Sequence, residues 1–443
     1  MVARLKNLRS EEVPGRGELL AGIRDIARPL RGPADLDPLI AMTHGRRFVA
    51  IGEASHGTHE HYRWRARLSR RLIEEQRFTW IGVEGDWPDC WRINQWVRGI
   101  SDRHLDARAV LAGFERWPTW MWANTDVADF LDWLKSWNDA RPEADRVGFY
   151  GLDVYSLWDS LARIIDWLGA HAPDSLPAAL RAWRCFAPYD DDPHRYAWST
   201  RLVPQTCEAD VVDLLVEVRR RAARDGDDAF DAEQNAAVAV GAERYYRAMV
   251  RTDRGSWNIR DVHMTDTIDR VARHLGTSSR GLIWEHNTHV GDARATPMAR
   301  EGLVNVGQLL RERHGRSDVL LVGAAAHRGE VMAAPAWGAP EQRMTLPPAR
   351  GGSHEALLHE ALGAPAVLPF PADRSAAWLR ETHGHRAVGV LYEPEREAGN
   401  YVPTVMGTRY DALIWTEDTT AVTPLHHERS PDEPEYETEP TGF

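Results

Sequence analysis

The chain has 443 residues, of which 43% are hydrophobic and 27% are charged, as in an ordinary soluble globular protein with a large core. Its net charge of −12 argues against a nucleic-acid partner, because binding to a phosphate backbone requires a basic surface. No apolar stretch is long enough to span a bilayer and the N-terminus lacks the apolar core of a secretory signal, so we expect no membrane partner and a cytoplasmic location.

Cysteine usage is sparse. The three cysteines, Cys90, Cys185 and Cys207, are odd in number and include no Cys-x-x-Cys pair. This pattern predicts neither a disulfide framework nor a thiolate metal site, and instead favours free cytosolic thiols.

The predicted elements alternate between strands and helices. An N-terminal segment, residues 1–45, is expected to hold one helix over 19–30. Apolar runs then predict strands at 47–53, 78–84, 146–152, 280–285, 318–323, 387–392 and 410–415, and helical periodicity follows the first two at 61–76 and 88–97. This order predicts an α/β fold with a mainly parallel central sheet flanked by helices.

Residues 165–275 interrupt this alternation. The block is rich in Ala, Arg and Glu and predicts long helices over 232–250 and 260–274. We expect a helical insertion or subdomain that covers the active-site cleft; a purely structural helical layer is the alternative. The α/β core would then consist of 46–164 and 276–425, and the acidic, proline-rich tail at 426–443 is expected to be disordered.

Two strand ends carry the first candidate site residues. Glu53 and His56 follow the first strand, and Glu84 ends the second. Ligands of open α/β sheets bind beyond the carboxyl ends of the strands, so these side chains are candidates for chemistry. A histidine there can act as a general base, with Glu53 orienting its ring. Neighbouring strands lie roughly 5 Å apart, so we expect Glu84 to reach this pair unless it merely caps the following helix.

A third strand end carries two histidines. Glu285, His286 and His289 follow the run at 281–284 with the spacing His-x-x-His. Together with His56 or a glutamate the histidines could bind a metal such as zinc, or they could orient water and stabilise a developing oxyanion. The spacing alone does not decide between these roles.

Other side chains are candidates for substrate binding. His327 and Arg328 follow the strand at 318–323, and packing or surface solvation would explain them equally well. The chain has 19 tryptophans, of which Trp87 follows Glu84, while Trp120 and Trp122 lie in one loop-like stretch. Aromatic rings line apolar ligand pockets, although a place in the core is as probable for each of these.

Six ordered motifs across about residues 45 to 420 resemble the erythromycin esterase family. They are Gly-Glu-Ala-Ser-His-Gly-Thr-His-Glu from Gly52, Val-Glu-Gly-Asp-Trp-Pro-Asp from Val83, Trp-Asn-Ile-Arg-Asp-Val-His-Met from Trp257, Glu-His-Asn-Thr-His-Val from Glu285, His-Arg-Gly from His327 and Tyr-Asp-Ala-Leu-Ile from Tyr410. Macrolide esterases of this family hydrolyse a macrolactone with a histidine that activates water and no covalent nucleophile. The chain departs from the family pattern at Glu285, where members often have a small residue.

The resemblance implies a set of catalytic residues. The matching base is His56, and the other matching polar residues are Glu53, Arg65, Glu84, His286 and His289. In the implied mechanism Glu53 and Glu84 hold the His56 tautomer, while Arg65, His286 or His289 stabilises the oxyanion and returns a proton to the leaving alkoxide.

The expected function is hydrolysis of an ester or lactone without a cofactor. We expect a small-molecule substrate and a monomer or small homo-oligomer. Three alternatives stay open: a metal-dependent hydrolase, a biosynthetic enzyme that uses the same His/Glu site for elimination, cyclisation or acyl transfer, and a non-catalytic binding protein.

Overall fold

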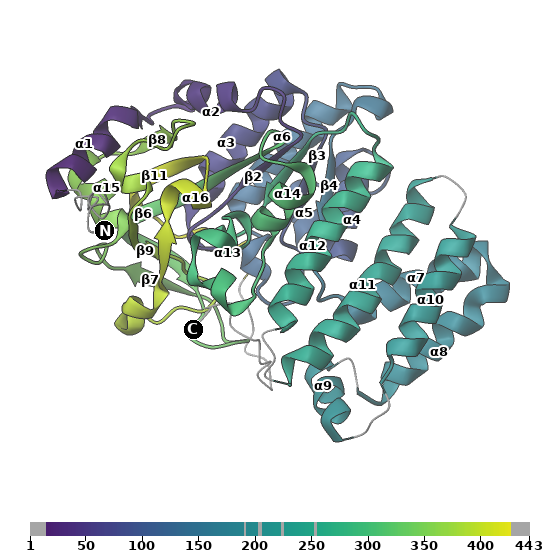
Figure 1. The fold of residues 1–443 in the computed structure, drawn as a ribbon. Coiled ribbons are helices and arrows are strands. Elements are labelled where there is room, and N and C mark those ends of the chain that lie inside the picture. The colour runs from purple at the N-terminus through teal and green to yellow at the C-terminus, as the bar shows by residue number, and fades with distance from the viewer. Residues whose placement is uncertain (1–14, 190–191, 203–205, 223–225, 252–254, 427–443) are drawn as a thin grey trace, which may run out of the picture.

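The computed structural model describes residues 15–189, 192–202, 206–222, 226–251 and 255–426. Residues 1–14 of the predicted N-terminal segment and nearly all of the predicted tail lie outside these ranges. The described residues form a mixed α/β fold in which helices flank a central, mostly parallel sheet (Figure 1). No described helix is both long and apolar enough to cross a membrane.

Six parallel strands form the centre of the sheet, in the order β11-β6-β2-β5-β3-β4. Their bounds are β2 (Phe48–Ile51), β3 (Trp80–Val83), β4 (Gly148–Gly151), β5 (Gly281–Trp284), β6 (Val319–Ala333) and β11 (Ala412–Thr419). Six of the seven predicted strands are therefore confirmed. The order has one consequence for the site: β5 lies between β2 and β3 and pairs with both, so the expectation that β2 and β3 are neighbours is wrong.

The predicted strand at 387–392 is wrong. This stretch makes only isolated bridges, Ser55 with Val388 and Ala334 with Leu391. Ala387, Val390 and Leu391 line the pocket described below, and Val388 and Tyr392 pack in a small hydrophobic cluster.

Five further strands were not predicted from the sequence, because they are short and several are polar. At one edge β8 (Ala366–Pro369) runs antiparallel to β11, and β1 (Arg28–Pro29) pairs with β8. The strand β7 (Gln342–Leu346) is antiparallel to the distal part of β6. Outside the main sheet β9 (Thr382–Arg386) and β10 (Tyr401–Val405) form an antiparallel pair.

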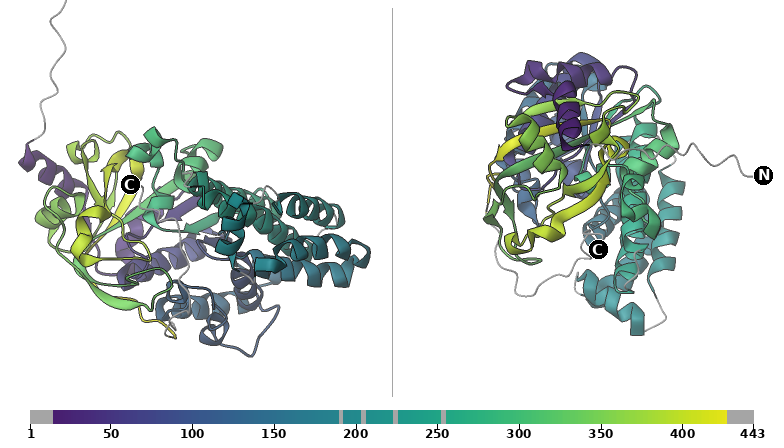
Figure 2. Two further views of the ribbon diagram at one scale, coloured as in Figure 1. Left: turned by 90° about the horizontal axis from the view of Figure 1, so that it is seen from below. Right: turned by 60° about the vertical axis from the view of Figure 1, so that its left-hand side comes forward.

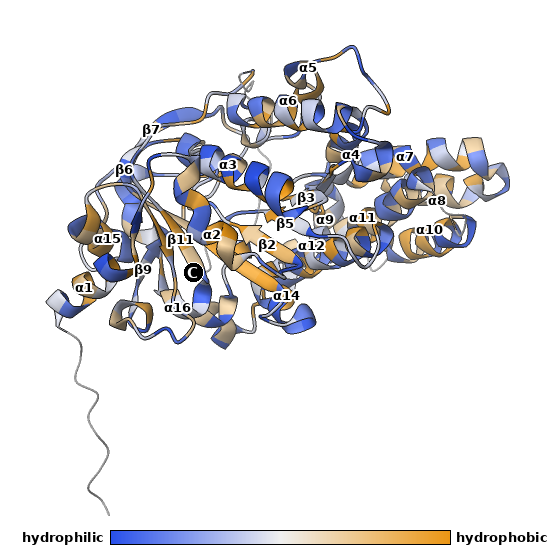
Figure 3. Ribbon diagram, turned by 90° about the horizontal axis from the view of Figure 1, so that it is seen from above, coloured by the Kyte–Doolittle hydropathy of each residue, from blue (hydrophilic) through white to orange (hydrophobic). Residues whose placement is uncertain are grey.

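Helices bury both faces of the sheet, which explains why its strands are apolar at successive positions. Alternate strand residues pack on opposite sides, such as Val49 and Ile51 with α3 and Phe48 and Ala50 with α12 and α14. Figure 3 shows hydrophobic residues concentrated on these strands, β2 above all. The helices of this part are α1 (Arg16–Ile26), α2 (Asp37–Met42), α3 (His59–Gln76), α4 (Trp87–Val97), α5 (Ala107–Leu111), α6 (Thr125–Asp139), α13 (Asn287–Val290), α14 (Val306–His314), α15 (His354–Leu362) and α16 (Met406–Arg409).

The long block in the middle of the chain is helical throughout its described residues. It comprises α7 (Leu157–His171), α8 (Leu176–Phe186), α9 (Pro193–Leu202), α10 (Glu208–Arg221), α11 (Asp227–Met249) and α12 (Gly255–His274). Helices α7 to α11 share a separate hydrophobic cluster. They extend away from the sheet on the side of α4, so the molecule is elongated (Figure 2), while α12 packs against the sheet itself.

The prediction of free thiols is wrong for two of the three cysteines. Cys185, near the end of α8, and Cys207, just before α10, form a disulfide. The packing of α8 against α10 brings their Cα atoms to 5.8 Å, a proximity that a separation of 22 residues in the chain does not reveal. Cys90 is buried on α4 and remains free.

Candidate functional site

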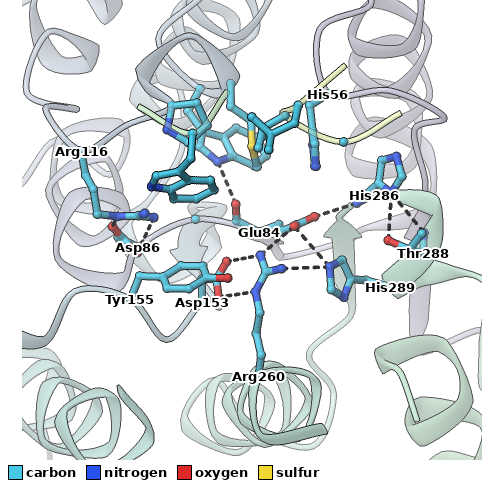
Figure 4. Close-up of a pocket in the computed structure, with 18 of the residues that line it drawn as sticks. His56, Glu84, Asp86, Arg116, Asp153, Tyr155, Arg260, His286, Thr288 and His289 are labelled. Atoms are coloured by element: carbon cyan, nitrogen blue, oxygen red, sulfur yellow. Dashed lines mark hydrogen bonds and ion pairs between the residues drawn. The ribbon is translucent and has the colours of Figure 1, made fainter. Parts of the chain in front are cut away.

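A pocket opens at the carboxyl ends of β2, β5, β3 and β4. It encloses about 1180 Å³, including its open mouth. Figure 4 shows its polar side, where side chains from the strand ends meet Arg260 of α12. The lining residues are His56, Glu84, Gly85, Asp86, Asp89, Phe114, Arg116, Pro118, Met121, Trp122, Asp153, Tyr155, Arg260, His286, Thr288, His289, Trp337, Ala387, Gly389, Val390, Leu391, Gly399, Asn400 and Val402.

His56 lies at the pocket wall with a carboxylate behind it. Its Nδ1 is 2.8 Å from Glu53 Oε1, while Glu53 Oε2 is 2.9 Å from Arg65 Nη1. Glu53 and Arg65 are each 1% exposed and do not line the pocket. With Nδ1 bound by Glu53, the Nε2 of His56 is the ring nitrogen left for chemistry in the pocket.

The Arg65 guanidinium sits among aromatic rings of the core. Its carbon is 4.5 Å from the ring centre of Tyr62, 4.8 Å from that of Trp284 and 5.6 Å from that of Trp122. These contacts fix the cation that holds Glu53. Arg65 therefore positions the Glu53–His56 pair from behind and is too deeply placed to stabilise an oxyanion in the pocket, one of its predicted roles.

The glycines around His56 serve close packing. A Cβ on Gly57 would lie 1.8 Å from the backbone oxygen of Met332, and one on Gly52 would lie 2.2 Å from Asn287 Oδ1. The loop after β2 is thus pressed against β6 and against the residue that follows His286. Gly57 is required for this close approach, because any side chain there would collide with the backbone of Met332.

Glu84 serves the opposite wall of the site. Its carboxylate accepts hydrogen bonds from Arg260 Nη2 at 2.8 Å and from the backbone N–H of His286 at 2.8 Å, and it lies 3.4 Å from His289 Nε2. No contact joins it to His56, because β5 intervenes between their strands. The prediction that Glu84 helps to hold the His56 tautomer is wrong; it fixes the backbone and the charges around His286 and His289.

Three charged residues of this network were not predicted as site residues. Arg260 donates from Nε and Nη2 to Asp153, at 2.9 and 2.7 Å, and its Nη1 lies 3.2 Å from His289 Nε2 (Figure 4). Asp261 holds the other nitrogen of His289, Nδ1, at 2.9 Å. Asp153 follows β4 and could have been found by the strand-end rule, whereas Arg260 and Asp261 lie on a helix whose position only the tertiary structure defines.

The network determines which groups carry charge. Burial would raise the pKa of Glu84, but the charges of His289 and Arg260 outweigh it and hold that pKa well below its usual value. Burial also raises the pKa of Asp153, but the charge and hydrogen bonds of Arg260 outweigh burial. The pKa of Asp153 is therefore below its usual value. The site therefore contains buried carboxylates that stay ionised beside two cations.

His289 is the group whose titration should be visible in the stability of the fold. Burial lowers its pKa, but Asp261 and Glu84 outweigh this effect and raise the pKa to about 10. An unfolded histidine titrates near pH 6.5, so the folded state binds this proton more tightly. Its contribution to stability is fully present below about pH 6.5 and is lost as the pH rises through about 10.

We therefore expect the melting temperature to fall between about pH 6.5 and 10, and to fall less steeply in His289→Asn. Thermal melts of both proteins over this range measure the two slopes. Equal slopes would show that His289 does not carry the proton assigned to it.

His286 is a neutral donor aimed at the pocket. Its Nδ1 accepts a hydrogen bond from the Thr288 N–H at 3.3 Å and lies 2.9 Å from Thr288 Oγ1. Burial, with the nearby charge of His56, lowers its pKa well below the usual value. The proton of the neutral ring is then on Nε2, which is buried, and the ring also has a hydrogen bond with the Ala54 backbone. The His286 and His56 rings are 4.7 Å apart between centroids.

Glu285 does not act as the predicted charged group. It is 1% exposed and outside the pocket lining, and neither carboxylate oxygen has a hydrogen-bond partner. Burial raises its pKa well above the usual value. Glu285 therefore lies behind the site in surroundings that favour its neutral form, and it is not a third carboxylate facing a substrate.

Of the other predicted substrate-binding residues, only Trp122 lines the pocket, and its Nε1 donates to the Glu84 backbone oxygen at 2.9 Å. Trp87 stacks on Trp91 and Tyr150 in the core, and Trp120 is fully buried. His327 and Arg328 lie on β6, beyond its pairing with β2, and do not line the pocket.

Segments from distant parts of the chain close the other side of the pocket. Residues from Ala387 to Val402, with Trp337, supply mostly apolar wall. Arg116 pairs with Asp86 at the rim, and its charge lies 4.8 Å above the Tyr155 ring. From the long helical block only Arg260 reaches the lining among the described residues, so α12 is the part of that block that builds the site.

The pocket does not gather ligands for a metal. Among the described residues, the group of three His, Cys, Asp or Glu side chains whose ligand atoms lie within 4.8 Å of one another is elsewhere in the fold. In the pocket, both nitrogens of His289 and one of His56 already face carboxylates. Activity without a cofactor stays a prediction.

Comparisons with known proteins agree with this architecture. The sequence profile described as "Erythromycin esterase" matches residues 73–419. The Bacillus subtilis (strain 168) protein named "Putative hydrolase YbfO" is 20% identical over 413 residues, which cover 87% of this chain and 86% of that protein.

Solved structures share the fold. A succinoglycan biosynthesis protein superposes with a TM-score of 0.75 at 19% identity, covering 92% of this chain and 98% of the other. A Bacillus cereus protein gives 0.74 at 18% identity, covering 93% and 100%. A mutant of the erythromycin esterase EreC in its open conformation gives 0.65 at 19% identity, covering 89% and 98%. Because the family profile spans most of the chain, this protein belongs to the erythromycin esterase family, and its membership supports a hydrolase of the esterase type.

Proposed function

We propose that the protein hydrolyses an ester or lactone bond of a small molecule, with His56 as the general base that activates water. His56 Nε2 takes a proton from water as the water oxygen attacks the ester carbonyl. Glu53 stabilises the imidazolium through Nδ1, and Arg65 keeps Glu53 in place. When the tetrahedral intermediate collapses, His56 returns its proton to the leaving alkoxide.

The observation that carries this proposal is the pairing of His56 with His286. A base with its free nitrogen in the pocket lies beside a neutral imidazole that also lines the pocket, and the two ring centroids are 4.7 Å apart. A carbonyl oxygen between them would receive the His286 hydrogen bond while water approaches from His56. Such a preorganised donor stabilises the negative charge that develops on the carbonyl oxygen.

The charged network around Glu84 holds His286 in this arrangement. Glu84 binds the His286 backbone N–H, and Arg260 and His289 neutralise Glu84. The apolar wall from Ala387 to Val402, with Trp122 and Trp337, suits a substrate with a large apolar body and few polar groups. A macrolide or another lactone is the proposed substrate class.

Product analysis tests the proposal. The wild-type protein is incubated in ¹⁸O-labelled water with a panel of macrolides, smaller lactones and simple esters, and the products are analysed by mass spectrometry. We expect one substrate class to gain one water, with the label in the new carboxylate, and no such product from His56→Asn. A converted substrate without labelled oxygen would contradict hydrolysis and favour elimination, cyclisation or acyl transfer.

A further inference from the structure

A second cluster of metal-binding side chains lies outside the catalytic pocket. It consists of His327 on β6, Glu417 on β11 and His359 on α15, with one potential ligand atom from each within 4.8 Å of the other two. None of the three lines the pocket.

The fold explains why these residues meet. Strands β6 and β11 pair in parallel with Ala326 opposite Thr416 and Arg328 opposite Asp418, which places His327 beside Glu417 on one face of the sheet. Helix α15 packs on β6, and His359 in its last turn stacks on His327 with 3.7 Å between ring centroids and 1° between the planes. Two groups thus come from rigid strands and one from a helix above them.

Ordinary pairing does not account for all of the cluster. His359 Nδ1 contacts Glu417 Oε1, which by itself would be a simple ion pair. The residue is only 8% exposed, and its second carboxylate oxygen, Oε2, is buried without a hydrogen-bond partner. A buried carboxylate oxygen left unsatisfied beside two imidazoles points to a cation that would complete its coordination.

We propose that His327, His359 and Glu417 bind a divalent transition metal, for which Zn²⁺ is the best match. Two imidazoles and one carboxylate are borderline-soft and hard donors that suit zinc, with a fourth position for water. The His359 side chain is 44% exposed, so that position opens to solvent.

Metal binding requires two local changes. The His359–Glu417 contact opens, so that both groups turn their lone pairs toward the ion. His327 Nδ1, which receives the Ala349 N–H at a long 3.3 Å, gives up that contact so that the ring can present a free nitrogen. The bound ion would link α15 to β6 and β11. It would lie beyond the part of β6 that pairs with β2, so we expect it to stabilise the fold without taking part in the reaction.

Zinc titration of the full chain tests this site. The protein is stripped with EDTA, freed of chelator, and titrated with Zn²⁺ by calorimetry, with melting temperatures measured alongside. We expect about one equivalent of zinc and a higher melting temperature in the wild-type protein. His359→Ala and Glu417→Gln should lose that equivalent and the thermal shift. The control His44→Ala removes an exposed histidine elsewhere and should behave as the wild type.

Two results would overturn the proposal. One is a wild-type protein that binds no zinc in the calorimetric titration. The other is His359→Ala that binds zinc as the wild type does, which would assign the ion to other residues, including those of the catalytic pocket. Because His359 is largely exposed, this variant should fold without metal, and its own melting temperature verifies that.

Discussion

Replacing His56 by asparagine should lower kcat/KM for the best substrate of the panel by about 10²- to 10⁴-fold, the usual contribution of a general base. Asparagine keeps the size and a hydrogen bond toward Glu53 but cannot take a proton from water. The fold should be unaffected, since His56 lies at the pocket wall and contributes one side-chain hydrogen bond. Steady-state kinetics and a thermal melt of the same preparation measure both effects.

Two further variants make this result specific. Glu53→Gln keeps the contact with His56 and removes the charge that stabilises the imidazolium, so kcat should fall more than KM changes. His171→Asn, at an exposed position on α7, should leave the kinetics unchanged. Full turnover by a correctly folded His56→Asn would exclude His56 as the base.

Replacing Arg260 by methionine should cost about 3–5 kcal/mol of unfolding free energy, the range found when one partner of a buried ion pair is removed. Methionine fills a similar volume but leaves the carboxylate of Asp153 buried without its cation, and it leaves Glu84 with His289 alone. Urea unfolding measures the loss. Activity should fall as well, because Glu84 would no longer hold the His286 backbone in place.

A second substitution separates charge from packing in this prediction. In Arg260→Met with Asp153→Asn, the unpaired charge of Asp153 is absent as well, so part of the lost stability should return. As a control, Arg328→Met removes a surface arginine that pairs with Asp418 at 2.9 Å, and it should change stability little, because exposed ion pairs contribute little. Equal losses of unfolding free energy in Arg260→Met and Arg328→Met would contradict the prediction that the buried ion pair contributes more than the exposed one.

The predicted parts of the site share one physical origin. His56, Glu84 and His286 each follow a short apolar run, and the carboxyl ends of parallel strands meet at one edge of a sheet. That local pattern was sufficient to place these residues around one pocket. It could not show which carboxylate serves which histidine, because this depends on the order of the strands, and β5 is inserted between β2 and β3 although it comes some two hundred residues later.

The aromatic and apolar residues show the limits of local patterns in another way. Trp120 and Trp122 are two residues apart and both buried, yet of these two only Trp122 lines the pocket. The apolar run at 387–392 has the composition of a strand, but it serves as pocket wall. Burial in a core and burial against a ligand pocket favour the same side chains, so hydrophobicity alone does not separate them.

The sequence by itself determined the α/β class, the strand-end chemistry of Glu53 and His56, and membership of a family, because these depend on periodicity and on residues close together in the chain. Only the tertiary structure decided that Arg260 and Asp261 of α12 complete the site, that Cys185 and Cys207 join, and that His327, His359 and Glu417 converge. These contacts link residues separated by 22 to 176 positions. Their proximity is set by how helices pack on the sheet, which no local pattern encodes.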